Sequence, residues 1–206
     1  MNAAHRFDRT YWENHWAPTA SNDTRHLPVN PYLSAEIGHL PPGTALDAGC
    51  GAGTEALWLA TRGWQVTGAD ISASALATAT ARASAAGLSS STEWVEVDLT
   101  CWEPDRRWDL VITNYAHPES GQLAFYAQIA SWVAPAGTIL IVGHVHDSDH
   151  GHAHPDGATA TQGGITELFT RPDWRVESRY ENARNVHGGG RQMQLRDVIV
   201  RARRIS

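Results

Sequence analysis

At 206 residues, with 42% hydrophobic and 18% charged residues, the chain has the size and composition of one globular domain. Its formal net charge of −6 argues against a nucleic-acid partner, because proteins that bind nucleic acids usually carry a basic patch. Two cysteines imply no disulfide framework, and the polar, aromatic start and the lack of a long apolar run imply neither a signal peptide nor a membrane span. We therefore expect a cytoplasmic protein with no membrane partner.

Two short helices are expected first, over residues 6–16 and 30–39. From residue 44 onward, segments typical of strands alternate with segments typical of helices, which predicts a parallel α/β sheet. The expected strands cover residues 44–48, 65–70, 92–97, 108–113, 138–142, 175–180 and 192–201. The expected helices among them cover residues 54–62, 72–86, 121–133 and 165–170.

A glycine-rich turn, with Gly49, Gly51 and Gly53, follows the first expected strand, and Asp70 ends the second. Glycines let a ligand approach the backbone, and an acid at this distance accepts hydrogen bonds from ribose hydroxyls. The spacing is shorter than that of a pyrophosphate-binding turn, and the carboxylate of Asp47 repels a diphosphate and attracts an ammonium group. The motif therefore points away from an NAD-dependent reductase and toward a ligand with a cationic amino-acid tail.

The run Leu-Asp-Ala-Gly-Cys-Gly-Ala-Gly over residues 46–53 resembles motif I of the class I S-adenosylmethionine-dependent methyltransferases. Residues 69–72, 97–99, 108–115 and 135–138 resemble their later motifs, in order, so that the resemblance covers roughly residues 30–145. The small-molecule branch with the tellurite-resistance and thiopurine methyltransferases is the most similar.

The resemblance implies a Rossmann-like, doubly wound, seven-stranded sheet, mostly parallel with an antiparallel last strand, and an N-terminal helical cap. It divides a single domain into a cap (1–40), a cofactor-binding core (41–145), a His-rich loop (146–164) and C-terminal strands (165–206). It also implies S-adenosylmethionine as cofactor and S-adenosylhomocysteine as product.

The resemblance assigns roles to residues around the methionine and ribose parts of the cofactor. Gly49, Gly51 and Gly53 would lie under these parts. Asp47 would hold the amino group, and Asp70 would bind both ribose hydroxyls.

Further roles follow for residues at the ends of later strands. Ile71 and Leu99 would pack on the two faces of the adenine, although either could simply be a core residue. Asp98 would accept a hydrogen bond from the adenine amino group. Asn114 and Tyr115 would face the methionine end and the substrate.

Aromatic residues of the first helix and a histidine after the fourth strand are candidates for the substrate side. Tyr11, Trp12 and Trp16 could form a lid, with cation–π attraction to the sulfonium, or could pack the helix on the domain. His117 could be a general base, a substrate contact or an ordinary loop histidine.

The segment 144–154 is rich in histidine and aspartate and lies in a long stretch without periodicity. His144 and His146, nearest the fifth strand, are the preferred catalytic contacts of this group, because histidine titrates near neutral pH. The segment also offers candidate metal ligands, without a firm metal site: His144, His146, His150, His152 and His154.

Taken together, the motifs predict methyl transfer from S-adenosylmethionine to oxygen, nitrogen or sulfur of a small molecule. One alternative uses the same cofactor for aminocarboxypropyl transfer or cyclisation, and another is a metal-binding protein that acts through the His-rich loop. The sequence predicts neither the acceptor nor the oligomeric state.

Overall fold

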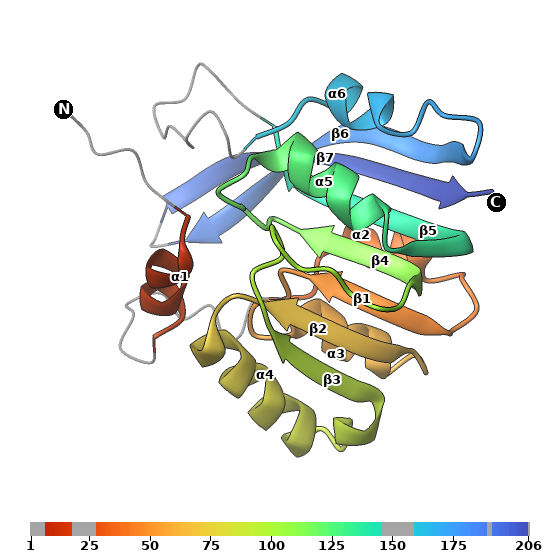
Figure 1. Cartoon of the computed structure of the whole chain (residues 1–206). Helices are drawn as coiled ribbons and strands as arrows, with labels where there is room; N and C mark the ends of the chain where they lie inside the picture. The colour runs from red at the N-terminus through yellow and green to blue at the C-terminus, as the bar shows by residue number, and fades with distance from the viewer. Residues whose placement is uncertain (1–6, 18–27, 146–158, 189–190, 206) are drawn as a thin grey trace.

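The computed structural model describes residues 7–17, 28–145, 159–188 and 191–205. Seven strands form one sheet in the order β3-β2-β1-β4-β5-β7-β6 (Figure 1). The strands are β1 (Thr44–Ala48), β2 (Gln65–Asp70), β3 (Thr92–Glu96), β4 (Trp108–Asn114), β5 (Val133–His144), β6 (Trp174–Gly188) and β7 (Arg191–Arg204). Neighbouring strands are parallel except β7, which is antiparallel to both β5 and β6, so the expected topology is confirmed.

Helices cover both faces of the sheet (Figure 1). They are α1 (Arg9–Trp16), α2 (Tyr32–Ile37), α3 (Thr54–Ala60), α4 (Ala73–Ala85), the 3-10 turn η2 (Ser89–Ser91), α5 (Gln122–Ala130) and α6 (Gln162–Glu167). As expected, Ser72 begins α4: its hydroxyl accepts a hydrogen bond from Ala75 N at 3.2 Å. In the described ranges, no helix is long and apolar enough to cross a membrane.

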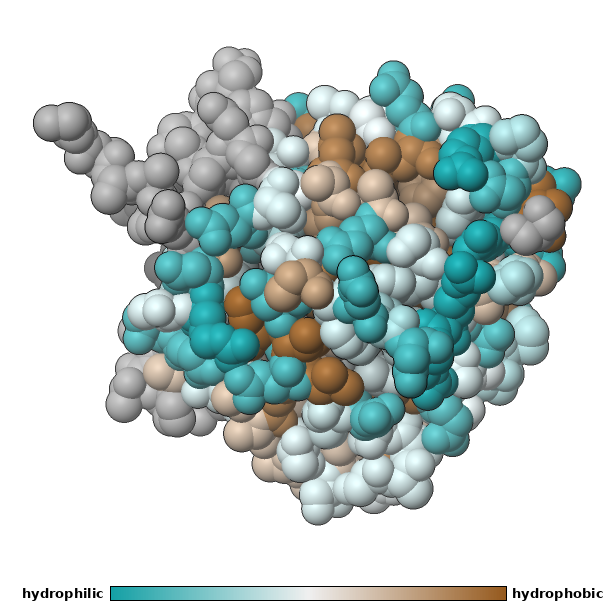
Figure 2. All heavy atoms as spheres, viewed as in Figure 1, coloured by the Kyte–Doolittle hydropathy of each residue, from teal (hydrophilic) through white to brown (hydrophobic). Residues whose placement is uncertain are grey.

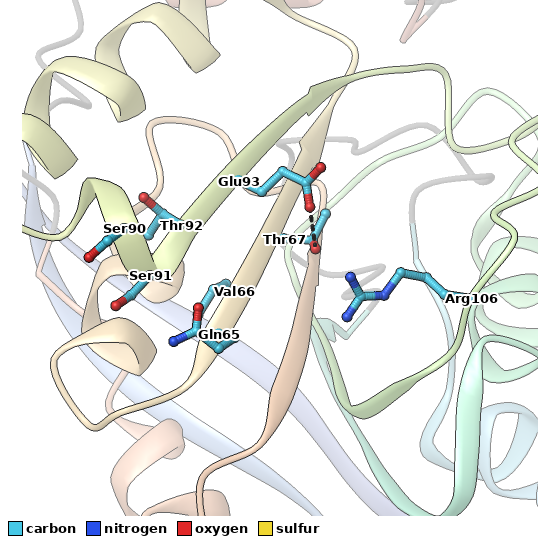
Figure 3. A pocket seen from close by; sticks show the side chains of 8 residues that line it. All are labelled: Gln65, Val66, Thr67, Ser90, Ser91, Thr92, Glu93 and Arg106. Carbon is cyan, nitrogen blue, oxygen red and sulfur yellow. Dashed lines mark hydrogen bonds between the residues drawn. The ribbon is translucent and has the colours of Figure 1, made fainter.

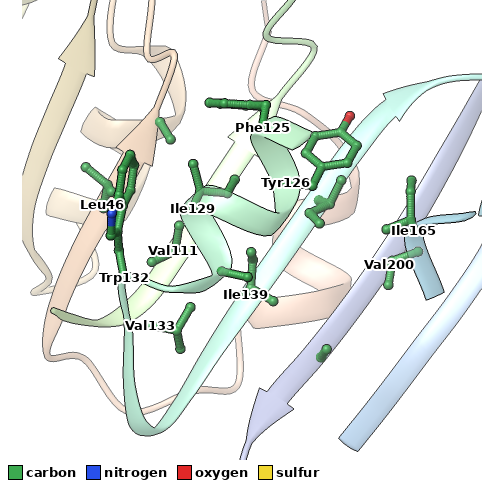
Figure 4. Close-up of a cluster of buried hydrophobic side chains, with 14 of the residues drawn as sticks. Leu46, Val111, Phe125, Tyr126, Ile129, Trp132, Val133, Ile139, Ile165 and Val200 are labelled. Carbon is green, nitrogen blue, oxygen red and sulfur yellow. The ribbon is translucent and has the colours of Figure 1, made fainter. Parts of the chain in front are cut away.

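Two hydrophobic clusters fill the layers on either side of the sheet. One joins α5 and α6 to strand residues such as Val111 and Ile139, and Figure 4 shows part of it. The other joins α2 and α3 to residues such as Leu110 and Leu140. Because successive strand residues point to opposite faces, central strands buried on both faces are apolar throughout. Burying one such leucine or isoleucine stabilises the fold by roughly 1.5–3 kcal/mol.

Three strands are longer than the sequence pattern predicts. β5 starts at Val133 rather than at residue 138, because Val133 pairs with Trp108 before an irregularity in the ladder, where Ala136 has a φ of 62°. β6 and β7 extend beyond residues 175–180 and 192–201. Their mutual ladder continues to Gly188 and Arg191 although β5 ends at His144. The two strands therefore project as a ribbon at the carboxyl edge of the parallel strands.

The first helix lies across this same edge and is held there by polar contacts. Arg9 donates to the Ile71 carbonyl at 2.8 Å and to Glu96 Oε1 at 2.5 Å. Glu13 accepts from the backbone N–H groups at the start of α4, at 2.6 Å from Ala73 and 3.3 Å from Ser74. None of the residues of α1 is fully buried, so these contacts fix where the helix sits.

Candidate functional site

The glycine-rich turn between β1 and α3 has a backbone that only glycine adopts easily. Gly49, Gly51 and Gly53 have φ values of 80°, 51° and 75°. A Cβ at Gly51 would lie 2.6 Å from the Trp16 ring. The Gly51 N–H donates to Asp70 Oδ2 at 2.8 Å. The expected glycines and Asp70 therefore meet, and Trp16 of α1 packs directly on the turn.

Two buried carboxyl groups, Asp47 and Asp70, and the half-buried Glu55 surround the turn. Burial raises the pKa of Asp47 well above its ordinary value, and the charges of Glu55 and Asp70 raise it further. Burial also raises the pKa values of Glu55 and Asp70. Among the described residues, Asp47 Oδ2 has no hydrogen-bond partner, and its side chain is buried. A cationic ligand would relieve this concentration of negative charge, and the ammonium and sulfonium groups of S-adenosylmethionine fit that need.

This acidic group gives a pH-dependence prediction. Raised pKa values mean that these carboxyls take up protons at a higher pH than ordinary carboxyls do. The affinity for S-adenosylmethionine should therefore fall as the pH drops through these raised pKa values. Titration calorimetry at several pH values checks this, and Asp47→Asn should flatten the dependence. An affinity independent of pH in the native chain would contradict the assignment.

The residues expected around the adenine lie at the ends of β2 and β3. Asp98 Oδ1 accepts from the Thr100 backbone at 2.9 Å and from its hydroxyl at 2.7 Å, which fixes the carboxylate. Leu99 is buried in the hydrophobic cluster on the α5 side. Ile71 is half-buried next to α1. The core interpretation of Leu99 thus has direct support, and the adenine roles of all three stay predictions.

The aromatic residues of α1 divide between two positions. Trp16 packs on the glycine turn, whereas the Trp12 ring lies 6.4 Å from the His117 ring, between centroids. Tyr11 stacks on His15 at 6.3 Å. The helix thus brings both tryptophans to the carboxyl edge of the sheet.

Asn114 and the residues after it form the far end of the site. Asn114 Oδ1 accepts from Asn30 Nδ2 at 2.9 Å, and its own buried Nδ2 has no hydrogen-bond partner among the described residues. Tyr115, with a φ of 55°, stacks on His144 with 4.3 Å between ring centroids. The His117 ring lies 6.0 Å from that of His144. The structure therefore brings Asn114, Tyr115, His117 and His144 together, as expected.

A buried acid that the sequence pattern does not predict, Asp197, lies beside this group. Asp197 is 0% exposed, and Oδ2 accepts from Tyr32 Oη at 2.9 Å and from Arg184 Nε at 2.5 Å. Arg184 also donates to Tyr115 Oη at 3.0 Å. The only local sign in the sequence that this acid is buried is its position directly before the apolar run Val-Ile-Val over residues 198–200. Arg184 is thus paired with this acid.

Four of the five candidate metal ligands lie outside the described residues: His146, His150, His152 and His154. Within the described ranges, no group of three or more His, Cys, Asp or Glu side chains is arranged to hold a metal ion. Metal binding by this segment therefore stays a prediction.

Family comparison agrees with this geometry. Residues 45–137 match the family model of a methyltransferase domain. The matched stretch is a little under half of the 206-residue chain. The chain is 34% identical over 119 residues to ribosomal RNA small subunit methyltransferase C of Alcanivorax borkumensis, covering 53% of the chain and 35% of that protein. It is 30% identical over 134 residues to probable thiol methyltransferase 2 of Arabidopsis thaliana, covering 63% of the chain and 59% of that protein.

The match therefore spans about a third of one curated relative and three fifths of the other. Among solved structures, TehB from Haemophilus influenzae superposes on this chain with a TM-score of 0.73 at 18% identity. The match covers 94% of this chain and 67% of that one. At that identity the likeness concerns the fold.

The rest of the surface offers a hollow far from the site. It lies at the amino ends of β2 and β3 and is lined by polar groups such as Glu93 and Arg106 (Figure 3). The candidate site lies at the opposite ends of these strands. Figure 2 shows hydrophobic side chains beside α1 at the carboxyl edge and over α5 and α6, where Leu123 is 42% exposed.

Proposed function

We propose that this chain is a class I S-adenosylmethionine-dependent methyltransferase, which binds its cofactor at the carboxyl edge of the sheet and transfers the methyl group to oxygen, nitrogen or sulfur of a small molecule. The observation that carries the proposal is the glycine turn, whose Gly51 N–H donates to Asp70 and which lies beside the buried carboxyls of Asp47 and Asp70. The glycine turn has no room for a Cβ atom at Gly49, Gly51 or Gly53. Among the described residues, the buried Asp47 Oδ2 has no hydrogen-bond partner, which suits a ligand that carries positive charge.

The proposed contacts follow the order of the strands. Asp47 would hold the ammonium group, and Asp70, already fixed by the N–H groups of Gly51 and Ser72, would accept from the ribose hydroxyls. The unpartnered amide nitrogen of Asn114 faces the methionine end in this proposal. Ile71, Leu99 and Asp98 would enclose the adenine.

The cofactor supplies a methyl group on a positively charged sulfur, which makes that carbon electrophilic. The protein mainly has to hold a nucleophile in line with it and exclude water. Trp12 and Trp16 are placed to cover the site and offer aromatic faces to the positive charge. Tyr115, His117 and His144 form the wall that we assign to the acceptor.

A small acceptor is favoured over RNA, although one relative is a ribosomal RNA methyltransferase. The carboxyl groups at the site and the net charge of −6 repel a phosphate backbone. The helix α1 lies over the edge where a large substrate would have to enter. The likeness to a probable thiol methyltransferase supports sulfur as one accepting atom.

Calorimetry and product analysis test this function. The full chain should bind S-adenosylmethionine and S-adenosylhomocysteine with one site each. Incubation with S-adenosylmethionine and a series of thiols, phenols and amines should yield S-adenosylhomocysteine. Formation of methylthioadenosine instead would show aminocarboxypropyl chemistry, and no binding of either ligand would overturn the proposal.

A further inference from the structure

A histidine and a buried aspartate face each other across the β5–β7 ladder. His144 and Asp197 are register partners, and directly opposite residues of an antiparallel pair present their side chains on the same face. His144 Nδ1 lies 3.5 Å from Asp197 Oδ1, and the histidine side chain is 17% exposed. The acid thus sits behind the imidazole, on the side away from solvent.

Asp197 is held in place by groups from two other elements. Tyr32 of α2 and Arg184 of β6 both donate to Oδ2, which directs Oδ1 toward His144. Burial alone would raise the pKa of Asp197, but hydrogen bonds from His144, Arg184 and Tyr32 lower it below its ordinary value. The carboxylate is therefore ionised at neutral pH, and at 3.5 Å its Oδ1 favours a proton on the nearby Nδ1 of His144.

The plane of the imidazole is also fixed. Tyr115 stacks on the His144 ring at an interplanar angle of 20°, and Arg184 holds the tyrosine hydroxyl at 3.0 Å. Among the residues that the structure describes, the charged and titratable groups that face His144 are thus Asp197 from β7, Arg184 from β6, Tyr115 after β4 and the more distant His117.

The Nδ1 atom of His117, unlike that of His144, faces a hydrogen-bond donor. Gln122 Nε2 lies 2.9 Å from its Nδ1 and also donates to the Ala116 carbonyl at 2.8 Å, which identifies this end of the amide as the donor. Nδ1 of His117 then accepts, and its proton is on Nε2. A neutral amide also stabilises an imidazolium far less than a carboxylate does. Of the two histidines, His144 is the one arranged to take up a proton.

We propose that Asp197 is a positioning residue that fixes His144 as the Nδ1–H tautomer, so that His144 Nε2 takes the proton of the methyl acceptor. This inference rests on the proposed function and narrows its substrate class. The acceptors would be hydroxyls and un-ionised thiols, whose accepting oxygen or sulfur still carries its proton when the substrate binds. The acceptor's O–H or S–H bond breaks while its oxygen or sulfur bonds to the methyl carbon. The proton goes to Nε2, and the electron pair of the broken carbon–sulfur bond stays on the cofactor sulfur.

Nitrogen NMR of the full chain tests the positioning without any turnover. Histidine is labelled with ¹⁵N, and His144→Gln assigns the signal. His144 should be the Nδ1–H tautomer and His117 the Nε2–H tautomer, with or without S-adenosylhomocysteine. In Asp197→Asn, Arg184 and Tyr32 would donate to the amide oxygen of the new asparagine, so that its NH₂ group would face Nδ1 of His144. The proton of His144 should then move to Nε2, whereas the tautomer of His117 should stay unchanged. An Nε2–H tautomer at His144 in the native chain would overturn the proposal.

Kinetics with two thiols of similar shape test the proton transfer. Phenylmethanethiol is largely un-ionised near neutral pH, whereas thiophenol is largely ionised. His144→Gln should lower the rate with phenylmethanethiol by about 100-fold, a usual contribution of general-base catalysis, and the rate with thiophenol by less than tenfold. Equal losses with both thiols would overturn the base role.

Controls separate this inference from the proposed function. His144→Gln should bind S-adenosylhomocysteine as tightly as the native chain in calorimetry, and His39→Gln, at an exposed position, should leave both rates unchanged. Failure of the native chain to bind the ligand would refute the proposed function. Intact binding with equal losses would refute only the role of His144. Should Asp197→Asn not fold, His144→Gln and the native tautomer still decide the question.

Discussion

Asp70→Ala is expected to weaken the binding of S-adenosylhomocysteine about 100-fold or more. The carboxylate is placed to accept from two ribose hydroxyls, and hydrogen bonds to charged groups contribute about 1.5–3 kcal/mol each. Two such losses correspond to at least two powers of ten in affinity. The substitution also removes the acceptor of the Gly51 N–H, which holds the glycine turn at 2.8 Å from Asp70.

Titration calorimetry of the purified variant measures this loss. Asp105→Ala is the matched control, because Asp105 is exposed in the connection between β3 and β4, and its affinity should equal that of the native chain. Circular dichroism establishes that Asp70→Ala is folded. A folded Asp70→Ala variant with native affinity would refute the assignment of this edge of the sheet as the cofactor site.

Asp197→Ala should lower the free energy of unfolding by about 3–5 kcal/mol, because it leaves a partly buried guanidinium without its counter-ion. Arg184 donates to Asp197 at 2.5 Å, and Tyr32 would lose its acceptor as well. Urea denaturation followed by tryptophan fluorescence gives the free energy and its denaturant slope. The loss should appear as a lower midpoint with little change in slope.

A second aspartate–arginine pair on the surface provides the comparison. Asp173 lies 3.4 Å from Arg171, whose side chain is 77% exposed, and such pairs contribute at most about 1 kcal/mol. Asp173→Ala should therefore shift the urea midpoint only slightly. Equal shifts for the two variants would mean that the buried network does not contribute to stability as its burial implies.

Most of the fold follows from local sequence patterns. The apolar run that becomes β4 is readable because a central parallel strand is buried on both faces. The start of α4 is readable because Ser72 is a good N-cap, and β2 ends at Asp70 as expected. The cofactor side of the site is equally local, since the glycine turn and its acid lie on consecutive strands.

The acceptor side could not be predicted in the same way. His144 was selected as a histidine after a strand, but its partner Asp197 lies 53 residues further along the chain and is brought to it by antiparallel pairing. Tyr32, Arg184 and Asp197 come from three elements, so no spacing in the sequence relates them. The extension of β6 beyond Tyr180 was missed for a different reason: residues 181–185, Glu-Asn-Ala-Arg-Asn, are mostly polar and show no apolar alternation.

The pairing of β5 with β7 also decides which changes in chain length this protein can accept. Side chains alternate between faces along a strand, so a one-residue insertion between Asp197 and Arg203 would turn the acid away from His144 toward the α5 side. Removing one residue from that stretch would do the same. Residues added at the ribbon tip, beyond Gly188, do not change the register between His144 of β5 and Asp197 of β7. Natural length variation should therefore concentrate at the tip, and the strand between the acid and the C-terminal arginines should keep a constant number of residues.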